Sequence, residues 1–321
     1  MHRVFIQKWC SAILRNPKAQ LIMQSEKKIL LTGAGGQLGQ TILAQANSEN
    51  IVAYTHQQLD LTDVVAMTDA LHTEQPDIII NCAAWTEVDA AEESVQSAYA
   101  VNSEVPANIA RWCLTNECYM LHISTDYVYS GEKPLFDAYA ENDEPDPMSV
   151  YGQSKWQGEK NIIASGLKNY AILRTAWLYG RSGKNFLKTM LRLVLSDPGR
   201  QYQVVDDQFG SPTPTDALTR QIRLVLNNKL TGIYHATAHG HCSWYVFACE
   251  IFALLGIEHN LVPCSTADYP TLASRPKNSI LCNAHFSNQG CDSFLSWQDE
   301  LKLFIEAYGD VLIAEAKAAI G

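Results

Sequence analysis

The chain has 321 residues, of which 47% are hydrophobic, and its formal net charge is −10 at pH 7. This balance predicts no basic surface for nucleic acid, and no apolar run is long enough to predict a membrane span. The nine cysteines include no C-x-x-C pair, which favours reduced thiols in a cytoplasmic protein over a disulfide framework.

The first 25 residues differ from the rest in composition. They carry four basic residues and no acidic residue. Lys8, Arg15 and Pro17 interrupt their apolar residues, so the segment lacks the core of a signal peptide. We therefore predict that residues 1–26 form a leader that is disordered or not native, and that the fold starts at residue 27.

A glycine-rich turn follows the first predicted strand, 28–32. The turn has the spacing G-x-x-G-x-x-G and leads into a predicted helix over 40–46. Glycines allow a tight turn and close approach to a pyrophosphate, which the helix N-terminus then binds. The sequence predicts a dinucleotide site formed by Gly33, Gly35, Gly36, Gln37, Leu38 and Gly39.

Strands and helices alternate through the first half of the chain. Strands are predicted over 51–54, 78–82, 119–124 and 170–175; helices are predicted over 64–72, over 92–113 with a break near 101–106, and from Tyr151. Such alternation predicts an α/β fold with a doubly wound parallel sheet, similar to a Rossmann fold. Its ligand crevice lies beyond the carboxyl ends of the strands. Thr32, Ala83, Ala84, Thr125 and Thr175 fall at those ends.

The second half is less regular. Helices are predicted over 186–196, 216–226, 242–255 and 297–319, with a strand over 232–236 and a loop over 206–214. We predict a dinucleotide-binding domain from 27–180 plus 211–239, and a smaller substrate domain from 181–210 plus 240–321.

Tyr151 and Lys155 stand four residues apart on a predicted helix, so they share one face. A cation beside a phenol favours the phenolate, and such a phenol is suited to proton donation. Thr125, at the end of the preceding strand, can complete a three-residue site. The arrangement suits proton delivery to a carbonyl oxygen while a hydride reaches its carbon.

The end of the second strand bears on cofactor choice. NAD-preferring sites usually have an acidic residue there, on the ribose 2′-hydroxyl. Here the strand ends Ala53-Tyr54-Thr55-His56, with no acid to repel a 2′-phosphate. The sequence favours NADPH, with NADH as the alternative.

One cluster, His235, His239, His241 and Cys242, has the spacing of metal ligands. His235 falls in a predicted strand and the others in the turn that follows, so their side chains need not converge on one ion. The sequence therefore predicts no metal site.

Several motifs occur in the order found in a known family. They are the glycine turn, Asn81–Asp89, Ser124–Tyr129, Tyr151–Lys155, Arg174–Gly180, Asp207–Thr213 and Ser274–Ser279. With these motifs the chain resembles the extended short-chain dehydrogenase/reductases, and within them the dTDP-4-dehydrorhamnose reductases. The resemblance runs from Lys28 to about Trp297.

The resemblance implies reduction of the C4 ketone of dTDP-4-dehydro-6-deoxy-L-mannose to dTDP-L-rhamnose. It implies Tyr151 as the acid, Lys155 on the nicotinamide ribose and Thr125 on the substrate carbonyl. Asp60, Leu61, Ala83 and Ala84 would bind the cofactor. Substrate contacts would come from Thr86, Val88, Asp126, Tyr127, Trp177, Asn185, Gln208 and Arg275. The family also implies an optional Mg²⁺ and a homodimer.

Two alternatives stay open at this point. A nucleotide-sugar epimerase of the same superfamily would keep its NAD⁺ and return the hydride. A non-catalytic subunit, resembling the regulatory β subunit of methionine adenosyltransferase, would act as a binding partner instead.

Overall fold

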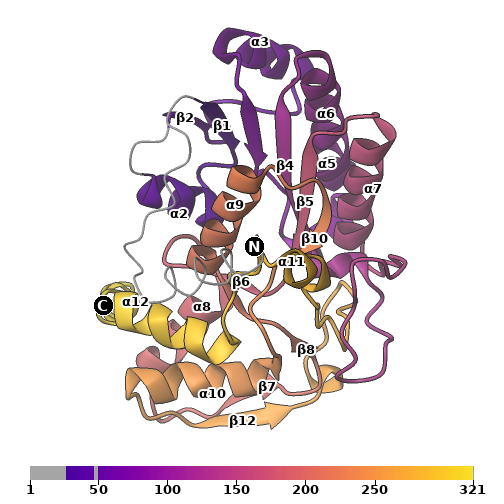
Figure 1. Ribbon diagram of the computed structural model, residues 1–321. Coiled ribbons are helices and arrows are strands. Elements are labelled where there is room, and N and C mark those ends of the chain that lie inside the picture. Colours follow the sequence, from indigo (N-terminus) through magenta and orange to yellow (C-terminus); the bar gives the residue numbers. More distant parts are fainter. Residues whose placement is uncertain (1–26, 47–49, 321) are drawn as a thin grey trace.

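A six-stranded parallel sheet forms the centre of the protein, in the order β10-β5-β4-β3-β1-β2 (Figure 1). The computed structural model describes residues 27–46 and 50–320, so the predicted leader lies outside the described residues. The strands are β1 (Lys28–Thr32), β2 (Asn50–Tyr54), β3 (Ile78–Asn81), β4 (Tyr119–Thr125), β5 (Tyr170–Thr175) and β10 (Gly232–His235). The predicted doubly wound α/β fold is confirmed.

Helices cover both faces of the sheet, because successive strand side chains point to opposite sides. Leu30 and Ile79 pack with residues of α3 (Val64–Glu74), α6 (Val105–Thr115) and α7 (Val150–Ala164). Ile29 and Leu31 instead join a core with residues of α2 (Gln37–Gln45) and α9 (Thr215–Asn228). Both faces of β1 are therefore buried.

The predicted helix over 92–113 is divided into four pieces. These are α4 (Val88–Glu93), α5 (Val95–Tyr99), the π-helical turn η1 (Ala100–Glu104) and α6. Pro106 lies in the first turn of α6 and has no N–H to donate to the carbonyl of Asn102. The π-helical turn therefore coincides with the break that was predicted near 101–106.

A second hydrophobic core lies below the sheet in Figure 1. It contains residues of α8 (Phe186–Ser196), α10 (Trp244–Leu255) and α12 (Trp297–Ala318), and of the paired strands β7 (Tyr202–Val205) and β12 (Leu261–Cys264). The sequence did not predict β7 or β12. Helix α11 (Ala284–Gln289) belongs to the main core instead, since Phe286 stacks on Tyr234 of β10. The proposed division into two domains stays a prediction.

Short strands occupy the predicted loop over 206–214. Strand β8 (Phe209–Gly210) pairs with β11 (Cys242–Ser243), and β9 (Thr213–Pro214) pairs with β6 (Leu178–Tyr179). Two 3₁₀ turns, η2 (Asp126–Val128) and η3 (Thr266–Asp268), complete the elements. Helix α10 starts later than predicted because Ser243 is its N-cap and accepts a hydrogen bond from the Val246 N–H at 3.1 Å.

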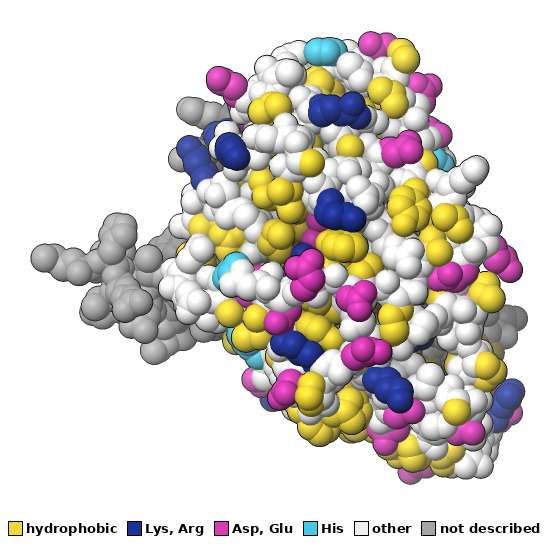
Figure 2. Space-filling model, turned by 90° about the vertical axis from the view of Figure 1, so that its right-hand side faces the viewer, with side chains coloured by type: hydrophobic (Ala, Val, Ile, Leu, Met, Phe, Trp, Pro, Cys, Tyr) yellow, Lys and Arg dark blue, Asp and Glu magenta, His cyan; other side chains and the backbone are white. Residues whose placement is uncertain are grey.

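Figure 2 shows one face of the surface. Lys and Arg side chains are interspersed with Asp and Glu there, and no continuous basic patch gathers on this face. No helix in the described part of the chain is both long and apolar enough to cross a membrane.

Candidate active site

Strand β2 lies on one side of β1 and β3 lies on the other, so the order of the strands changes direction between β1 and β3. The loops that follow these two strands meet. A Cβ on Gly33 would lie 2.6 Å from the backbone nitrogen of Ala83. In open parallel sheets, ligands bind beyond the strand ends at such a switch point. A cavity of about 800 Å³ lies here, lined by residues from the ends of β1 to β5 and from α2, α7 and α10.

The glycine turn forms one wall of this cavity. A Cβ on Gly39 would come within 2.4 Å of the Gly33 carbonyl oxygen, so only glycine allows α2 to start so close to β1. Gly36 is the N-cap of α2 and supplies no side-chain cap. The first N–H groups of α2 are therefore left for a ligand, and an anionic pyrophosphate fits this cradle.

Every residue predicted to bind the cofactor lines the cavity: Gly33, Gly35, Gly36, Gln37, Leu38, Gly39, Asp60, Leu61, Ala83, Ala84, Tyr151 and Lys155. The Asp60 carboxylate accepts hydrogen bonds from the Thr62 hydroxyl and N–H at 2.7 and 2.9 Å, which lower the pKa of Asp60. Its carboxylate thus holds the local turn. Four residues that were not predicted to bind the cofactor also line this end: Tyr54, Thr55, His56 and Gln57.

Thr125 and Tyr151 meet on the opposite wall. Thr125 ends β4, and Tyr151 lies in the first turn of α7, which Ser149 caps. A Cβ on residue 152 would lie 2.2 Å from the Tyr127 carbonyl oxygen, so Gly152 lets α7 pack directly on the turn after β4. This contact brings the Tyr127 and Tyr151 rings edge to face, with centroids 5.6 Å apart.

The Tyr151 phenol is a weaker acid than free tyrosine. Burial raises its pKa to about 12, while a hydrogen bond with Thr125 acts in the opposite direction. The phenol therefore carries its proton at neutral pH and can donate it.

Lys155 corrects one expectation. Its amine is hydrogen-bonded to β4 and not to Tyr151: Lys155 Nζ donates to the Ile123 carbonyl oxygen at 2.6 Å and lies 3.3 Å from His122 Nε2. Burial lowers the Lys155 pKa to about 8, although the nearby Glu159 charge raises it. Lys155 and Tyr151 both line the cavity, as their helical spacing predicted, and the hydrogen-bond partners of the amine lie on β4.

Asp126 adds a buried carboxylate to the cavity wall. Its Oδ1 accepts a hydrogen bond from the Thr125 hydroxyl at 3.0 Å, whereas its buried Oδ2 has no hydrogen-bond partner among the described residues. Burial raises the Asp126 pKa to about 6, while hydrogen bonding with the Ser279 and Thr125 hydroxyls acts in the opposite direction. Because Asp126 is also among the residues that line the cavity, a hydroxyl of a bound ligand could donate to its carboxylate.

Two stacked indoles form the far end of the cavity. The rings of Trp177 and Trp244 are parallel within 4° and their centroids lie 3.5 Å apart. Trp177 has a left-handed φ of 46°, and a Cβ on Gly210 would lie 2.4 Å from its indole. The sequence missed Trp244, because it begins α10 and only the tertiary fold brings it to Trp177.

The remaining predicted substrate residues fall into two groups. Thr86, Val88, Tyr127 and Trp177 line the cavity, but Asn185, Gln208 and Arg275 do not. Asn185 caps α8, and Gln208 donates to the Thr266 hydroxyl at 3.1 Å. Arg275 donates to both Asp89 oxygens at 3.1 and 2.7 Å.

Asn102 is a supporting residue that sequence reasoning missed. It lies in the π-helical turn, accepts from the Trp85 N–H at 2.9 Å and donates to the Ser154 hydroxyl at 3.0 Å. Asn102 thereby ties the loop after β3 to α7 beside Tyr151. The only signal for it was the predicted break near 101–106.

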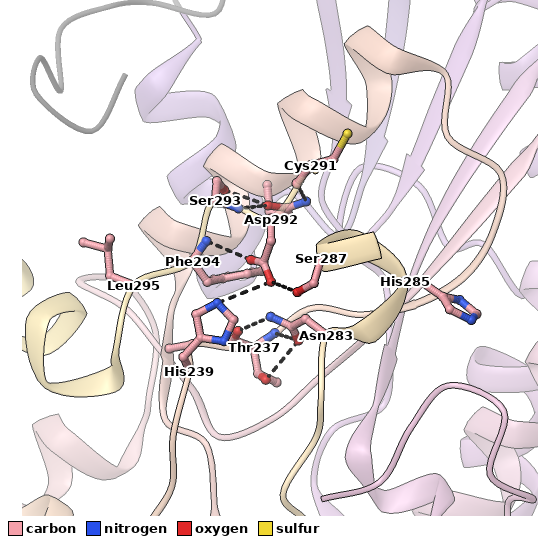
Figure 3. A network of polar contacts seen from close by, with 12 residues as sticks. Thr237, His239, Asn283, His285, Ser287, Cys291, Asp292, Ser293, Phe294 and Leu295 are labelled. Atoms are coloured by element: carbon pink, nitrogen blue, oxygen red, sulfur yellow. Dashed lines mark hydrogen bonds and ion pairs between the residues drawn. The ribbon is translucent and has the colours of Figure 1, made fainter. Parts of the chain in front are cut away.

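The histidine cluster points in different directions. His235 contacts the Tyr129 hydroxyl at 2.8 Å, His239 pairs with Asp292 at 3.3 Å (Figure 3), and His241 stacks on Phe136. The described residues contain no group of three or more His, Cys, Asp or Glu that could hold a metal ion. The Mg²⁺ implied by the resemblance therefore finds no such cluster in this part of the chain.

The cavity thus joins a dinucleotide cradle to a protonated tyrosine with a threonine beside it. The family model described as the RmlD substrate binding domain matches residues 27–309. This chain belongs to that family. The resemblance drawn from the motifs is thereby confirmed.

Three relatives show how far the likeness extends. The dTDP-4-dehydrorhamnose reductase of Aggregatibacter actinomycetemcomitans is 37% identical over 88% of this chain and 99% of its own length. A probable dTDP-4,6-dihydroxy-2-methyloxan-3-one 4-ketoreductase of Streptomyces antibioticus is 36% identical over 89% and 96%. The crystal structure of the Bacillus anthracis dTDP-4-dehydrorhamnose reductase in complex with NADP has a TM-score of 0.83 and 36% identity, over 88% of this chain and 99% of that chain.

Proposed function

We propose that this protein uses NADPH to reduce the C4 ketone of dTDP-4-dehydro-6-deoxy-L-mannose, giving dTDP-L-rhamnose. The single observation that carries the proposal is the cavity that holds both the α2 cradle and the Thr125–Tyr151 pair. The names of the relatives favour a reductase of a dTDP-linked sugar over an epimerase or a non-catalytic subunit. A cytoplasmic location and a homodimer remain part of the proposal.

The cofactor end supports a phosphorylated dinucleotide. Helix α2 would bind the pyrophosphate through its first N–H groups. His56 and Gln57 are exposed at the rim beyond β2, where neither would repel a 2′-phosphate. The Bacillus anthracis relative is in complex with NADP, which favours NADPH over NADH here.

Bound NADPH would supply a hydride to the substrate carbon. Tyr151 would donate its phenolic proton to the carbonyl oxygen, and Thr125 would hold that oxygen by a hydrogen bond. The raised pKa of Tyr151, about 12, supports an acid that is fully protonated in the ground state. Lys155, whose pKa of about 8 leaves its amine mostly protonated at neutral pH, would stabilise the phenolate left after the transfer.

The substrate end suits a sugar linked to a base. The Trp177–Trp244 stack offers a rigid apolar wall, and the Asp126 carboxylate in the same lining would accept a sugar hydroxyl. Thr86 and Val88 complete the lining on the side of β3. Arg275 would bind the diphosphate by exchanging its Asp89 partner for phosphate oxygens. Its planar guanidinium group can form paired hydrogen bonds with either a carboxylate or a phosphate.

Steady-state assays with enzymatically prepared sugars test this function. We expect NADPH to be consumed with dTDP-4-dehydro-6-deoxy-L-mannose, and NMR to identify dTDP-L-rhamnose as the product. Parallel reactions use the D-glucose-derived 4-keto isomer and the UDP-linked analogue, because the Streptomyces antibioticus relative is named for a different dTDP-linked ketone and the sugar and nucleotide must therefore be tested. Interconversion of sugars without net NADPH loss would identify an epimerase instead, and no turnover of any 4-keto sugar would refute the proposal.

A further inference from the structure

A row of buried polar side chains crosses the sheet beneath the cavity. Thr32 on β1, Asn81 on β3 and His122 on β4 are lateral neighbours in register, and Lys155 of α7 lies at the end of the row. All four are at most 1% exposed. The Thr32 hydroxyl donates to Asn81 Oδ1 at 2.7 Å, Asn81 Nδ2 lies 3.0 Å from His122 Nδ1, and His122 Nε2 lies 3.3 Å from Lys155 Nζ.

The direction of these hydrogen bonds is fixed by the backbone. The Ala83 N–H lies 3.2 Å from Asn81 Oδ1, and an N–H can only donate. The amide oxygen of Asn81 must therefore face Ala83, and its NH₂ group must face His122. It follows that His122 Nδ1 accepts a hydrogen bond and carries no hydrogen.

The other ring nitrogen then carries the hydrogen. Burial keeps the pKa of His122 well below its usual value, and the Lys155 charge acts in the same direction, so the imidazole is neutral. Its Nε2–H points at Lys155 Nζ. An ammonium group has no lone pair to accept this hydrogen, whereas a neutral amine has one. The contact is a hydrogen bond only when Lys155 is a neutral amine that donates to Ile123.

Two other titratable groups face the amine. Glu159, one turn later on α7, raises the Lys155 pKa, but its carboxylate is shared with Arg174, which it meets at 2.6 Å. Cys82 follows β3, and burial raises its pKa to about 12, so it remains a neutral thiol. Burial therefore lowers the Lys155 pKa against the Glu159 charge, and His122 is the buried ring that the amine faces.

We propose that His122 is a positioning residue for Lys155: held as the Nε2–H tautomer by Asn81, its imidazole fixes the place of the amine and favours its neutral form. The consequence for catalysis rests on the proposed function. An amine whose pKa lies near neutral pH is suited to return a proton to the Tyr151 phenolate after each turnover.

NMR of the full chain tests this without any activity measurement. Nitrogen-15 spectra of the histidine rings report the tautomer, and we expect His122 to keep its hydrogen on Nε2 throughout pH 6–9. Carbon-13 spectra of labelled lysine, with the Lys155 signal identified by its loss in Lys155→Met, report the protonation of the amine. A hydrogen on Nδ1, or a Lys155 that titrates as an ordinary lysine above pH 10, would overturn the proposal.

Two variants separate positioning from a merely structural role. In His122→Gln the amide can turn its oxygen to the ammonium group, so the Lys155 midpoint should rise by about one pH unit, the equivalent of one hydrogen bond. Met120→Ala, a cavity two residues earlier on β4, is the control that destabilises the strand and should leave the midpoint in place. Equal midpoints in wild type and His122→Gln contradict the proposal. If the Lys155 midpoint moves as expected but the wild-type protein does not consume NADPH with any 4-keto sugar, the result contradicts the proposed function and not the role of His122.

Discussion

The ion pair beneath the site predicts a large stability effect. Glu159 and Arg174 are 1% and 2% exposed, and the guanidinium donates to the carboxylate at 2.6, 3.0 and 3.2 Å. Replacing Glu159 by Gln keeps the shape but leaves the Arg174 charge buried without a counterion. Breaking a buried pair on one side costs about 3–5 kcal/mol.

Because glutamine retains one acceptor oxygen for Arg174, we expect the lower end, about 3 kcal/mol. The corresponding fall in Tm is about 6–12 °C. Urea unfolding followed by circular dichroism measures the free energy directly. Glu315→Gln is the matched control, because its pair with Lys188 at 3.2 Å is on the surface and should be worth at most about 1 kcal/mol.

The same variant should also move the titration of Lys155. Glu159 raises the Lys155 pKa, so removing its charge should shift the Lys155 midpoint to lower pH, opposite to His122→Gln. If Glu159→Gln lost no more stability than Glu315→Gln and left Lys155 unchanged, the account of this buried network would be refuted.

Three further outcomes follow from single side chains. Gly39→Ala places a methyl group 2.4 Å from the Gly33 carbonyl oxygen, so the turn must shift, and fluorescence titration should show NADPH binding weakened about 10-fold or more. Arg275→Lys keeps the charge but loses the fork, so KM for the sugar should rise about 10-fold while kcat is retained; an unchanged KM would remove Arg275 from the substrate site. Asp292 raises the pKa of His239, so the ion pair should stabilise the fold fully below pH ~6.5 and lose this effect as pH rises through the folded pKa. Because His239 is half exposed, we expect the pair to contribute less than about 1 kcal/mol to the free energy of unfolding. Unfolding of His239→Gln and wild type at pH 5.5 and 9 checks this, and an equal difference at both values would contradict it.

The predicted part of the site was the part encoded locally. Gly33 to Gly39 form a turn between a predictable strand and helix, and Thr125 and Tyr151 each mark the end or start of a predictable element. Their convergence then follows from the topology of a parallel sheet.

What the sequence could not predict depends on side chains meeting across the fold. The Lys155 amine contacts Ile123 and His122 because α7 packs on β4. Trp244 directly follows β11, and the pairing of β11 with β8 brings it against Trp177. The Asp89 partner of Arg275 lies on α4, 186 residues earlier in the chain, and no spacing rule connects them.

The measurement that tests the central claim most directly compares wild type with Tyr151→Phe in reduction of dTDP-4-dehydro-6-deoxy-L-mannose. The variant removes only the hydroxyl that is proposed to donate the proton. We expect kcat to fall about 100- to 10,000-fold while the Kd for NADPH stays within about twofold of wild type. Equal kcat values in the two proteins would contradict the claim that Tyr151 is the acid of a carbonyl reduction in this cavity.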